Sequence, residues 1–153
     1  MTELERRIGM IPFGLSIEDL ATVTVRYRVS STKAGSGFDE IRIQGDGRVE
    51  LSTAHTRDEA PEVREGRVER MLVVRLLQLL GVEGMEGWDE VYPSQNREYV
   101  DKVMTVGRGE ETVKRVAMCQ PEFAAFSRAC GALRLVASVA APEVLSGEFF
   151  RRI

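Results

Sequence analysis

The side chains best suited to catalysis in this chain are its single histidine and its two cysteines. Acid–base and nucleophilic catalysis need a nucleophile and a base within hydrogen-bond reach of each other. Any Ser–His–Asp or Cys–His arrangement would have to use His55, which lies in the polar stretch 54–65 and is expected to be solvated. Cys119 and Cys130 lie in apolar stretches and are predicted to be reduced thiols of the core. These residue types therefore do not predict a catalytic centre.

Metal binding is the second chemistry to consider, and the sequence does not favour it. Two cysteines and one histidine do not make up the familiar zinc-ligand sets. Glu83, Glu86, Asp89 and Glu90 lie in the stretch 81–96, but not at the spacing of a calcium-binding loop. With 24 Asp and Glu residues in the chain, carboxylate pairs arise by chance. We predict no catalytic residue, metal or cofactor, and keep a small hydrolase-like enzyme as an alternative.

The composition is typical of one soluble globular domain, because 43% of the 153 residues are hydrophobic and 29% are charged. The net charge of −3 supplies no overall positive field to attract nucleic acid. No apolar run approaches the roughly 18 residues of a membrane span, and residues 1–10 lack the apolar core of a signal peptide. Together with the reduced cysteines, these features predict a cytoplasmic protein without a membrane partner.

The stretch 67–80, RVERMLVVRLLQLL, is strongly apolar and is predicted to be the central helix. Its apolar side chains cover more than half of the helix circumference, whereas an ordinary surface helix shows a narrower stripe. The helix is therefore expected to pack on two neighbours. Both neighbours lie within the chain in the simpler interpretation, and in the alternative one side faces a partner protein. Gly81 is predicted to follow the helix end in the left-handed conformation.

Strands are predicted on both sides of this helix, and a second helix after them. Alternating apolar residues indicate strands over 22–30, 38–44, 48–53, 98–106 and 112–118. Gly-Asp-Gly at 45–47 predicts a tight hairpin turn, in which Asp46 is a structural residue. The last helix is predicted to open at Pro121, a position that proline tolerates. Residues 132–139 continue that helix or, in the alternative, form a strand.

These elements predict an α+β fold in the order strand, strand, strand, helix, strand, strand, helix. An antiparallel sheet of about five strands would carry the two main helices on one face. The domain is expected to span 22–140, between an N-terminal extension (1–21) and a C-terminal tail (141–153).

Three short motifs support a family resemblance over about residues 22–138. With IRIQGDGRVEL at 41–51 and GWDEVY at 87–92, the chain resembles a set of small bacterial α+β domains, mostly uncharacterised. Its first strand, the loop KAGSGF at 33–38 and the closing helix are also similar to emfourin-type domains, which inhibit thermolysin-like metalloproteases. The resemblance implies a bacterial α+β domain and an inhibitor-like role.

Two segments are predicted to contact a partner protein. One is the loop 31–37, STKAGSG, with Lys33, Gly35 and Gly37, because loops on a rigid scaffold often form binding surfaces. The other is the C-terminal tail, because aromatic residues and arginine are enriched at interface hot spots. The tail residues are Phe149, Phe150, Arg151 and Arg152. In the simpler interpretation of the tail the phenylalanines fold back onto their own domain.

A basic patch is the last feature. Arg26, Arg28, Arg42 and Arg48 are spaced to share one sheet face. A solvated face is the simpler interpretation, and weak nucleic-acid binding through phosphate contacts is the alternative. The favoured hypothesis is a non-enzymatic protein-interaction module: an accessory subunit, an adaptor or an inhibitor that acts by surface binding.

Overall fold

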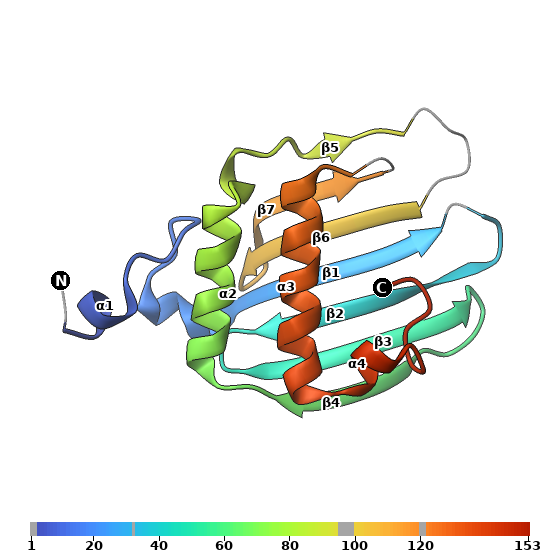
Figure 1. Ribbon diagram of the computed structural model, residues 1–153, viewed down its shortest axis with the longest axis horizontal. Coiled ribbons are helices and arrows are strands. Elements are labelled where there is room, and N and C mark those ends of the chain that lie inside the picture. Colours follow the sequence, from blue (N-terminus) through green and yellow to red (C-terminus); the bar gives the residue numbers. More distant parts are fainter. Residues whose placement is uncertain (1–2, 32, 95–99, 120–121) are drawn as a thin grey trace.

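A single sheet forms the base of the fold (Figure 1). The computed structural model describes residues 3–31, 33–94, 100–119 and 122–153, and within them seven strands form this sheet. The strands are β1 (Val23–Ser31), β2 (Ser36–Gln44), β3 (Arg48–Thr56), β4 (Glu62–Arg67), β5 (Val91–Tyr92), β6 (Val100–Arg108) and β7 (Glu111–Met118). They lie in the order β4-β3-β2-β1-β6-β7-β5. Neighbouring strands are antiparallel, except that β5 runs parallel to β7.

Two long helices, α2 (Arg70–Val82) and α3 (Ala124–Ala140), lie side by side across one face of the sheet (Figure 1). Short helical segments flank them: α1 (Glu3–Ile8), η1 (Ile17–Thr22), η2 (Met85–Gly87) and α4 (Glu143–Ser146). The N-terminal segment is tied to α2, because Gln78 Nε2 donates a hydrogen bond of 2.6 Å to the carbonyl of Ile8. The α+β class and the two main helices were predicted correctly.

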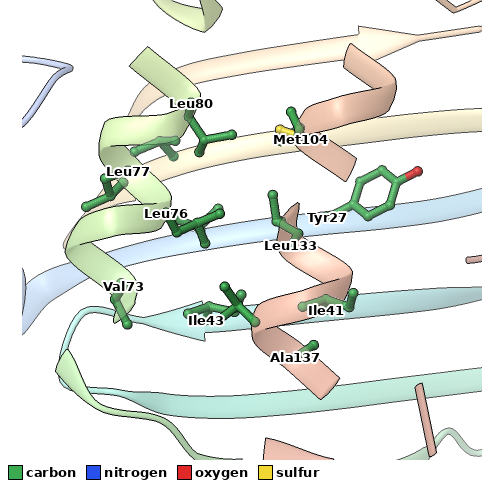
Figure 2. Packing of buried hydrophobic residues seen from close by; sticks show 14 of the residues in the cluster. Tyr27, Ile41, Ile43, Val73, Leu76, Leu77, Leu80, Met104, Leu133 and Ala137 are labelled. Carbon is green, nitrogen blue, oxygen red and sulfur yellow. The ribbon is translucent and has the colours of Figure 1, made fainter. Parts of the chain in front are cut away.

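The core lies between these helices and the sheet (Figure 2). It includes Val73, Leu76, Leu77 and Leu80 from α2, Leu133 and Ala137 from α3, and Tyr27, Ile41, Ile43 and Met104 from the strands. Burial of each large apolar side chain contributes roughly 1.5–3 kcal/mol. Along β1, buried Val25 and Tyr27 alternate with half-buried Arg26 and Arg28, as the period of two predicts. The arginines therefore project from the face opposite the helices.

The prediction of about five strands was wrong, because β4 and β5 lie in stretches expected to be irregular. The strand β4 is an edge strand in which five of the six residues are exposed and the sixth is half-buried. Such a strand shows no apolar alternation. The strand β5 contains only two residues, which is too short for any periodicity. The predicted helix over 132–139 is confirmed, since these residues lie within α3.

The predicted limits of the central helix were also inaccurate. Residue 67 belongs to β4, where it pairs with Arg48, and α2 begins at Arg70. Gly81 lies within α2, and a Cβ added to it would lie 2.9 Å from the Pro12 side chain. Gly84 adopts the left-handed conformation instead, with φ +87°. The predicted helix opening at Pro121 and strand start at Glu98 lie outside the described residues.

Candidate functional site

The histidine and the cysteines do not form a catalytic group. His55 lies in β3 and Cys119 follows β7, and strands β2, β1 and β6 separate β3 from β7. At about 4.8 Å per strand this spacing exceeds hydrogen-bond reach. Cys130 lies in α3, where burial raises the pKa of its thiol to about 12. Burial also raises the pKa of Cys119, so neither residue supplies a thiolate nucleophile at neutral pH.

The C-terminal tail folds back onto its own domain. Phe149 and Phe150 are 5% and 3% exposed, and their ring centroids lie 5.0 Å apart in an edge-to-face arrangement. The guanidinium of Arg64 lies 5.3 Å from the centroid of the Phe149 ring. The two phenylalanines, predicted as contacts for a partner, are therefore part of the chain's own core. This is the simpler of the two interpretations of the tail.

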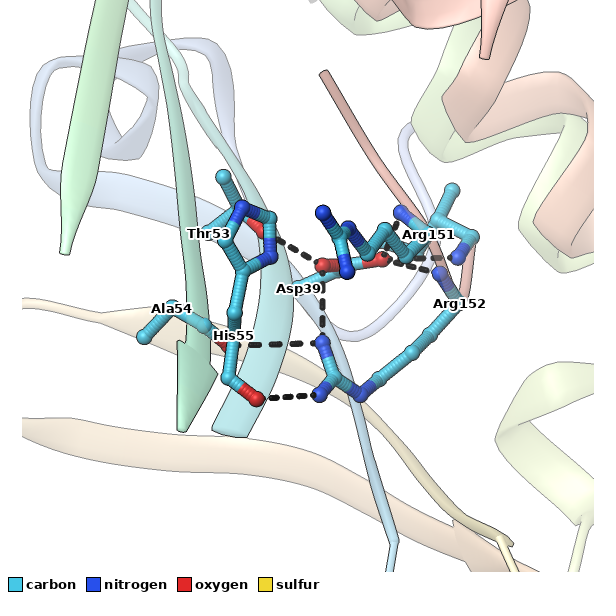
Figure 3. A network of polar contacts seen from close by, with 7 residues as sticks. Asp39, Thr53, Ala54, His55, Arg151 and Arg152 are labelled. Atoms are coloured by element: carbon cyan, nitrogen blue, oxygen red, sulfur yellow. Dashed lines mark hydrogen bonds and ion pairs between the residues drawn. The ribbon is translucent and has the colours of Figure 1, made fainter. Parts of the chain in front are cut away.

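A buried carboxylate holds this tail in place (Figure 3). Asp39 is fully buried, and its Oδ2 accepts hydrogen bonds from the backbone N–H groups of Arg151 (2.9 Å), Arg152 and Ile153 (3.0 Å). Its Oδ1 accepts a hydrogen bond of 2.7 Å from the Thr53 hydroxyl and lies 3.3 Å from Nη1 of Arg152. Successive N–H groups that converge on one anion form a backbone nest. The carboxylate of Asp39 is thus the anion that the N–H groups of the tail bind.

Arg152 is fully engaged within the chain. In addition to Asp39, its guanidinium donates to the carbonyl oxygens of Ala54 (3.3 Å) and His55 (3.2 Å) (Figure 3). Arg151, by contrast, has an exposed side chain. The structure therefore leaves Arg151, among the four predicted tail contacts, on the surface. Sequence reasoning missed Asp39, although its position in phase with buried Ile41 is a signal that a carboxylate lies on the core face.

The glycine-rich loop between β1 and β2 contains both surface and structural residues. Lys33 and Gly35 are exposed, and Gly35 has φ +78°. Gly37 is buried within β2, and a Cβ there would lie 1.7 Å from the carbonyl oxygen of Ala54. Gly37 thus allows β3 to approach β2. Lys33 and Gly35 are the predicted loop contacts that stay accessible.

The face opposite the helices carries the predicted arginines. Arg26 lies directly opposite Arg42 on β2 and Thr105 on β6, and Thr105 lies opposite Arg115 on β7. A hollow of about 190 Å³ is lined by Arg26, Arg28, Val103, Thr105 and Arg115. The hollow was not predicted, because Arg115 comes from a hairpin far along the chain. The sequence did predict that Arg26 and Arg28 lie on the same face of the sheet as Arg42 and Arg48.

A larger, apolar groove of about 510 Å³ lies between α2 and α3. Its lining includes Leu79, Leu135 and Leu145, which are 38%, 62% and 58% exposed. Val82 and Val139 nearby on the same helices are also exposed. The broad apolar surface of the central helix indicated the α2 side. The α3 side was missed, because Leu135 and Val139 lie outside the narrow stripe that the sequence showed for that helix.

Charged groups border the groove. Nη2 of Arg128 lies 2.8 Å from a carboxylate oxygen of Glu83, and this guanidinium holds the pKa of Glu83 below its ordinary value. Arg134 also lines the groove, and its Nε is buried without a hydrogen-bond partner in the part of the chain that the structure describes. Among the described residues, the groove therefore combines an apolar floor with a guanidinium group, that of Arg134, whose Nε has no hydrogen-bond partner.

A third hollow, of about 530 Å³, is enclosed by the N-terminal segment itself, with Arg6, Met10 and Ile17 among its lining residues. Among the described residues, its lining comes from positions 6–17 and includes one charged side chain, that of Arg6. The described lining includes no residue of the sheet or of the two main helices.

Comparison with known proteins adds no functional assignment. Over the described ranges, no helix is both long enough and apolar enough to cross a membrane. No protein-family model and no curated protein matches the chain.

Proposed function

We propose that this chain is a non-enzymatic protein-interaction module, acting as an accessory subunit, adaptor or inhibitor. In this proposal it binds an amphipathic helix of another protein in the groove between α2 and α3. The observation that carries the proposal is the group of exposed apolar side chains that line this groove, Leu79, Leu135 and Leu145, together with Val82 and Val139, which are exposed on the same two helices. Contiguous exposed apolar surface with a polar rim is typical of interaction sites.

The dimensions of the two helices favour a helical partner. At 1.5 Å per residue, the 13 residues of α2 and the 17 residues of α3 extend about 20 and 25 Å. A partner helix of about four turns, at about 5.4 Å per turn, matches that length. Its apolar side chains at positions i, i+3 or i+4, and i+7 would contact the floor of the groove. Because Arg134 makes no ion pair with the described residues, the partner helix is expected to carry an acidic residue near it.

The loop with Lys33 and Gly35 stays a predicted second contact for a partner. It lies at one end of the sheet (Figure 1), whereas the groove is lined by residues of α2, α3 and α4. An inhibitor role follows from the resemblance to emfourin-type domains and is tested directly by adding the protein to thermolysin. Retained protease activity would leave the adaptor and accessory-subunit roles.

The proposal is tested by selecting binders from a displayed library of helical peptides. We expect the selected peptides to share the helical spacing of apolar residues and an acidic position. Leu135→Asp places a charge on the groove floor and should abolish binding. The matched control is Val63→Asp, which changes an apolar residue that is 45% exposed on β4, and it should bind as the parent protein does.

Two results would contradict the proposal. One is peptide binding that persists in Leu135→Asp. The other is concentration-dependent dimerisation in sedimentation that Leu135→Asp removes, because the groove would then be occupied by a second copy of the chain.

A further inference from the structure

The hollow on the uncovered face of the sheet has an unusual concentration of guanidinium groups. Arg26 and Arg28 come from β1, Thr105 from β6 and Arg115 from β7. The strand register places Arg26, Thr105 and Arg115 in one row across three adjacent strands. At about 4.8 Å per strand, the backbones of the two arginines at the ends of this row are about 10 Å apart. Long guanidinium side chains on either side of a hydroxyl can therefore converge on one small ligand.

The positive charge in this region is only partly neutralised. Glu40, whose side chain is 7% exposed, pairs with Arg26 and lies 3.9 Å from Arg42. The guanidinium carbon of Arg28 lies 3.8 Å from the centroid of the Phe38 ring, which orients this arginine without cancelling its charge. Arg115 makes no ion pair with any described residue. Arg28 makes none either, so two of the four guanidinium groups on this face are not paired with a carboxylate, whereas Glu40 lies beside Arg26 and Arg42 and Glu50 lies opposite Arg42 on β3.

The fold keeps these like charges close together at a cost. Arg26 and Arg42 are directly opposite each other on neighbouring strands, an arrangement that is destabilising for like charges. Glu40 offsets part of this repulsion, and an anion bound in the hollow would offset the charge of Arg28 and Arg115 and gain charge-assisted hydrogen bonds.

We propose that this hollow binds the phosphate group of a small phosphate ester. Arginine presents donors in a planar fork that matches phosphate oxygens, and such hydrogen bonds are among the strongest in proteins. The Thr105 hydroxyl adds a donor between the arginines. The hollow has a volume of about 190 Å³, well above the roughly 10–15 Å³ that a single water molecule needs by this measure. That space suits one tetrahedral oxyanion with a small organic group.

The surroundings of the hollow favour a compact anion over a nucleic-acid strand. Glu50 on β3 lies opposite Glu65 on β4. On the other side of β1, Asp101 on β6 lies opposite Ser30. These carboxylates interrupt any continuous positive track, which a phosphodiester backbone needs for affinity. The whole chain also carries a net charge of −3. The site therefore fits a single phosphate group.

The test is an NMR titration of the ¹⁵N-labelled full chain with inorganic phosphate and with phenyl phosphate at constant ionic strength. We expect saturable shifts of the amides around Arg26, Thr105 and Arg115. Arg115→Gln should weaken phosphate affinity about tenfold, the effect of one charge-assisted hydrogen bond. Arg48→Gln is the matched control, because it removes the same charge from the same face outside the hollow. Arg48 pairs with Asp46 at 3.7 Å, and its substitution should leave the affinity unchanged.

Three results would overturn the proposal. Equal weakening by both substitutions, or the same shifts with chloride, would show general charge screening. Tighter binding of a short single-stranded oligonucleotide, lost in Arg115→Gln, would assign the hollow to nucleic acid. If Arg115→Gln does not fold, Arg28→Gln takes its place. This site is independent of the proposed protein-binding role, so Leu135→Asp should bind phosphate normally even if it fails to bind a helical peptide.

Discussion

The attachment of the C-terminal tail to Asp39 allows a quantitative prediction. The substitution Asp39→Ala removes a fully buried carboxylate that accepts three backbone hydrogen bonds from residues 151–153. It also removes the ion pair with Arg152, whose N–O distance is 3.3 Å. Removing one member of a buried charge pair typically costs about 3–5 kcal/mol, because its partner groups are left unsatisfied. We expect the free energy of unfolding to fall by about that amount.

The tail itself provides the control for this prediction. In a chain that ends at Ser146, Asp39 has already lost the three N–H donors and Arg152. The same Asp39→Ala substitution should then cost about 1 kcal/mol or less, because only the hydrogen bond from Thr53 is lost. The difference between the two backgrounds is the coupling energy between carboxylate and tail. Urea unfolding of the four proteins, followed by circular dichroism, measures it.

An equal cost in both backgrounds would refute the idea that Asp39 holds the tail. Truncation also removes Phe149 and Phe150 from the core, so the shortened chain will be less stable. A second measurement therefore uses the full-length protein alone. Asp39→Ala should increase the rate at which carboxypeptidase removes the C-terminal residues, because the tail detaches more often. An unchanged rate would contradict the mechanism.

Three further predictions concern the core and the backbone. Burial raises the pKa of Cys130 to about 12 from 9.0, so the unfolded chain loses this proton first and stability should fall from about pH 9 to 12. The slope is up to about 1.4 kcal/mol per pH unit for this thiol, and urea unfolding should show a shallower fall in Cys130→Ala. Leu76→Ala should cost about 2–5 kcal/mol, whereas Leu79→Ala, at an exposed position, should cost under about 1 kcal/mol. Gly37→Ala places the new Cβ 1.7 Å from the carbonyl oxygen of Ala54, so it should lower the thermal unfolding temperature strongly. Gly35→Ala has open space around the Cβ but keeps φ +78°, so it should cost only about 1–2 kcal/mol and lower that temperature less.

The sequence predicted the strands well where burial of one sheet face makes apolar and polar residues alternate. The alternation of Val25 and Tyr27 with Arg26 and Arg28 predicted both the strand and its two faces. The apolar side chains point into the core, and the arginines point to the opposite face. The edge strand β4 has solvent at most of its positions. Its position in the sheet comes from backbone pairing with residues 48–53 of β3, and backbone pairing leaves no apolar pattern in the sequence.

The candidate sites were less predictable, because they depend on distant segments. Arg26 and Arg115 meet through the pairing of β1 with β6 and of β6 with β7. Leu135 and Leu145 become groove residues only once α3 lies beside α2. The buried Phe149 belongs to a tail whose backbone N–H groups bond to Asp39, more than a hundred positions earlier in the chain. None of these contacts has a local sequence signature.

The place of β1 in the middle of the sheet has a consequence for the order of folding. On one side β1 pairs with β2 through a short connection, and on the other side it pairs with β6, from Val23 opposite Arg108 to Ser31 opposite Val100. The pairing of β1 with β6 closes a much longer loop. Because closing it costs more chain entropy, this pairing is expected to form later. We expect the meander of β1 to β4 to form first, with one edge of β1 unpaired until β6 arrives. Pulse-labelled hydrogen exchange should then protect amides of β2 and β3 before those of β6 and β7, and simultaneous protection would contradict this order. During that interval the open edge of β1 is the part of the molecule most exposed to pairing with another chain.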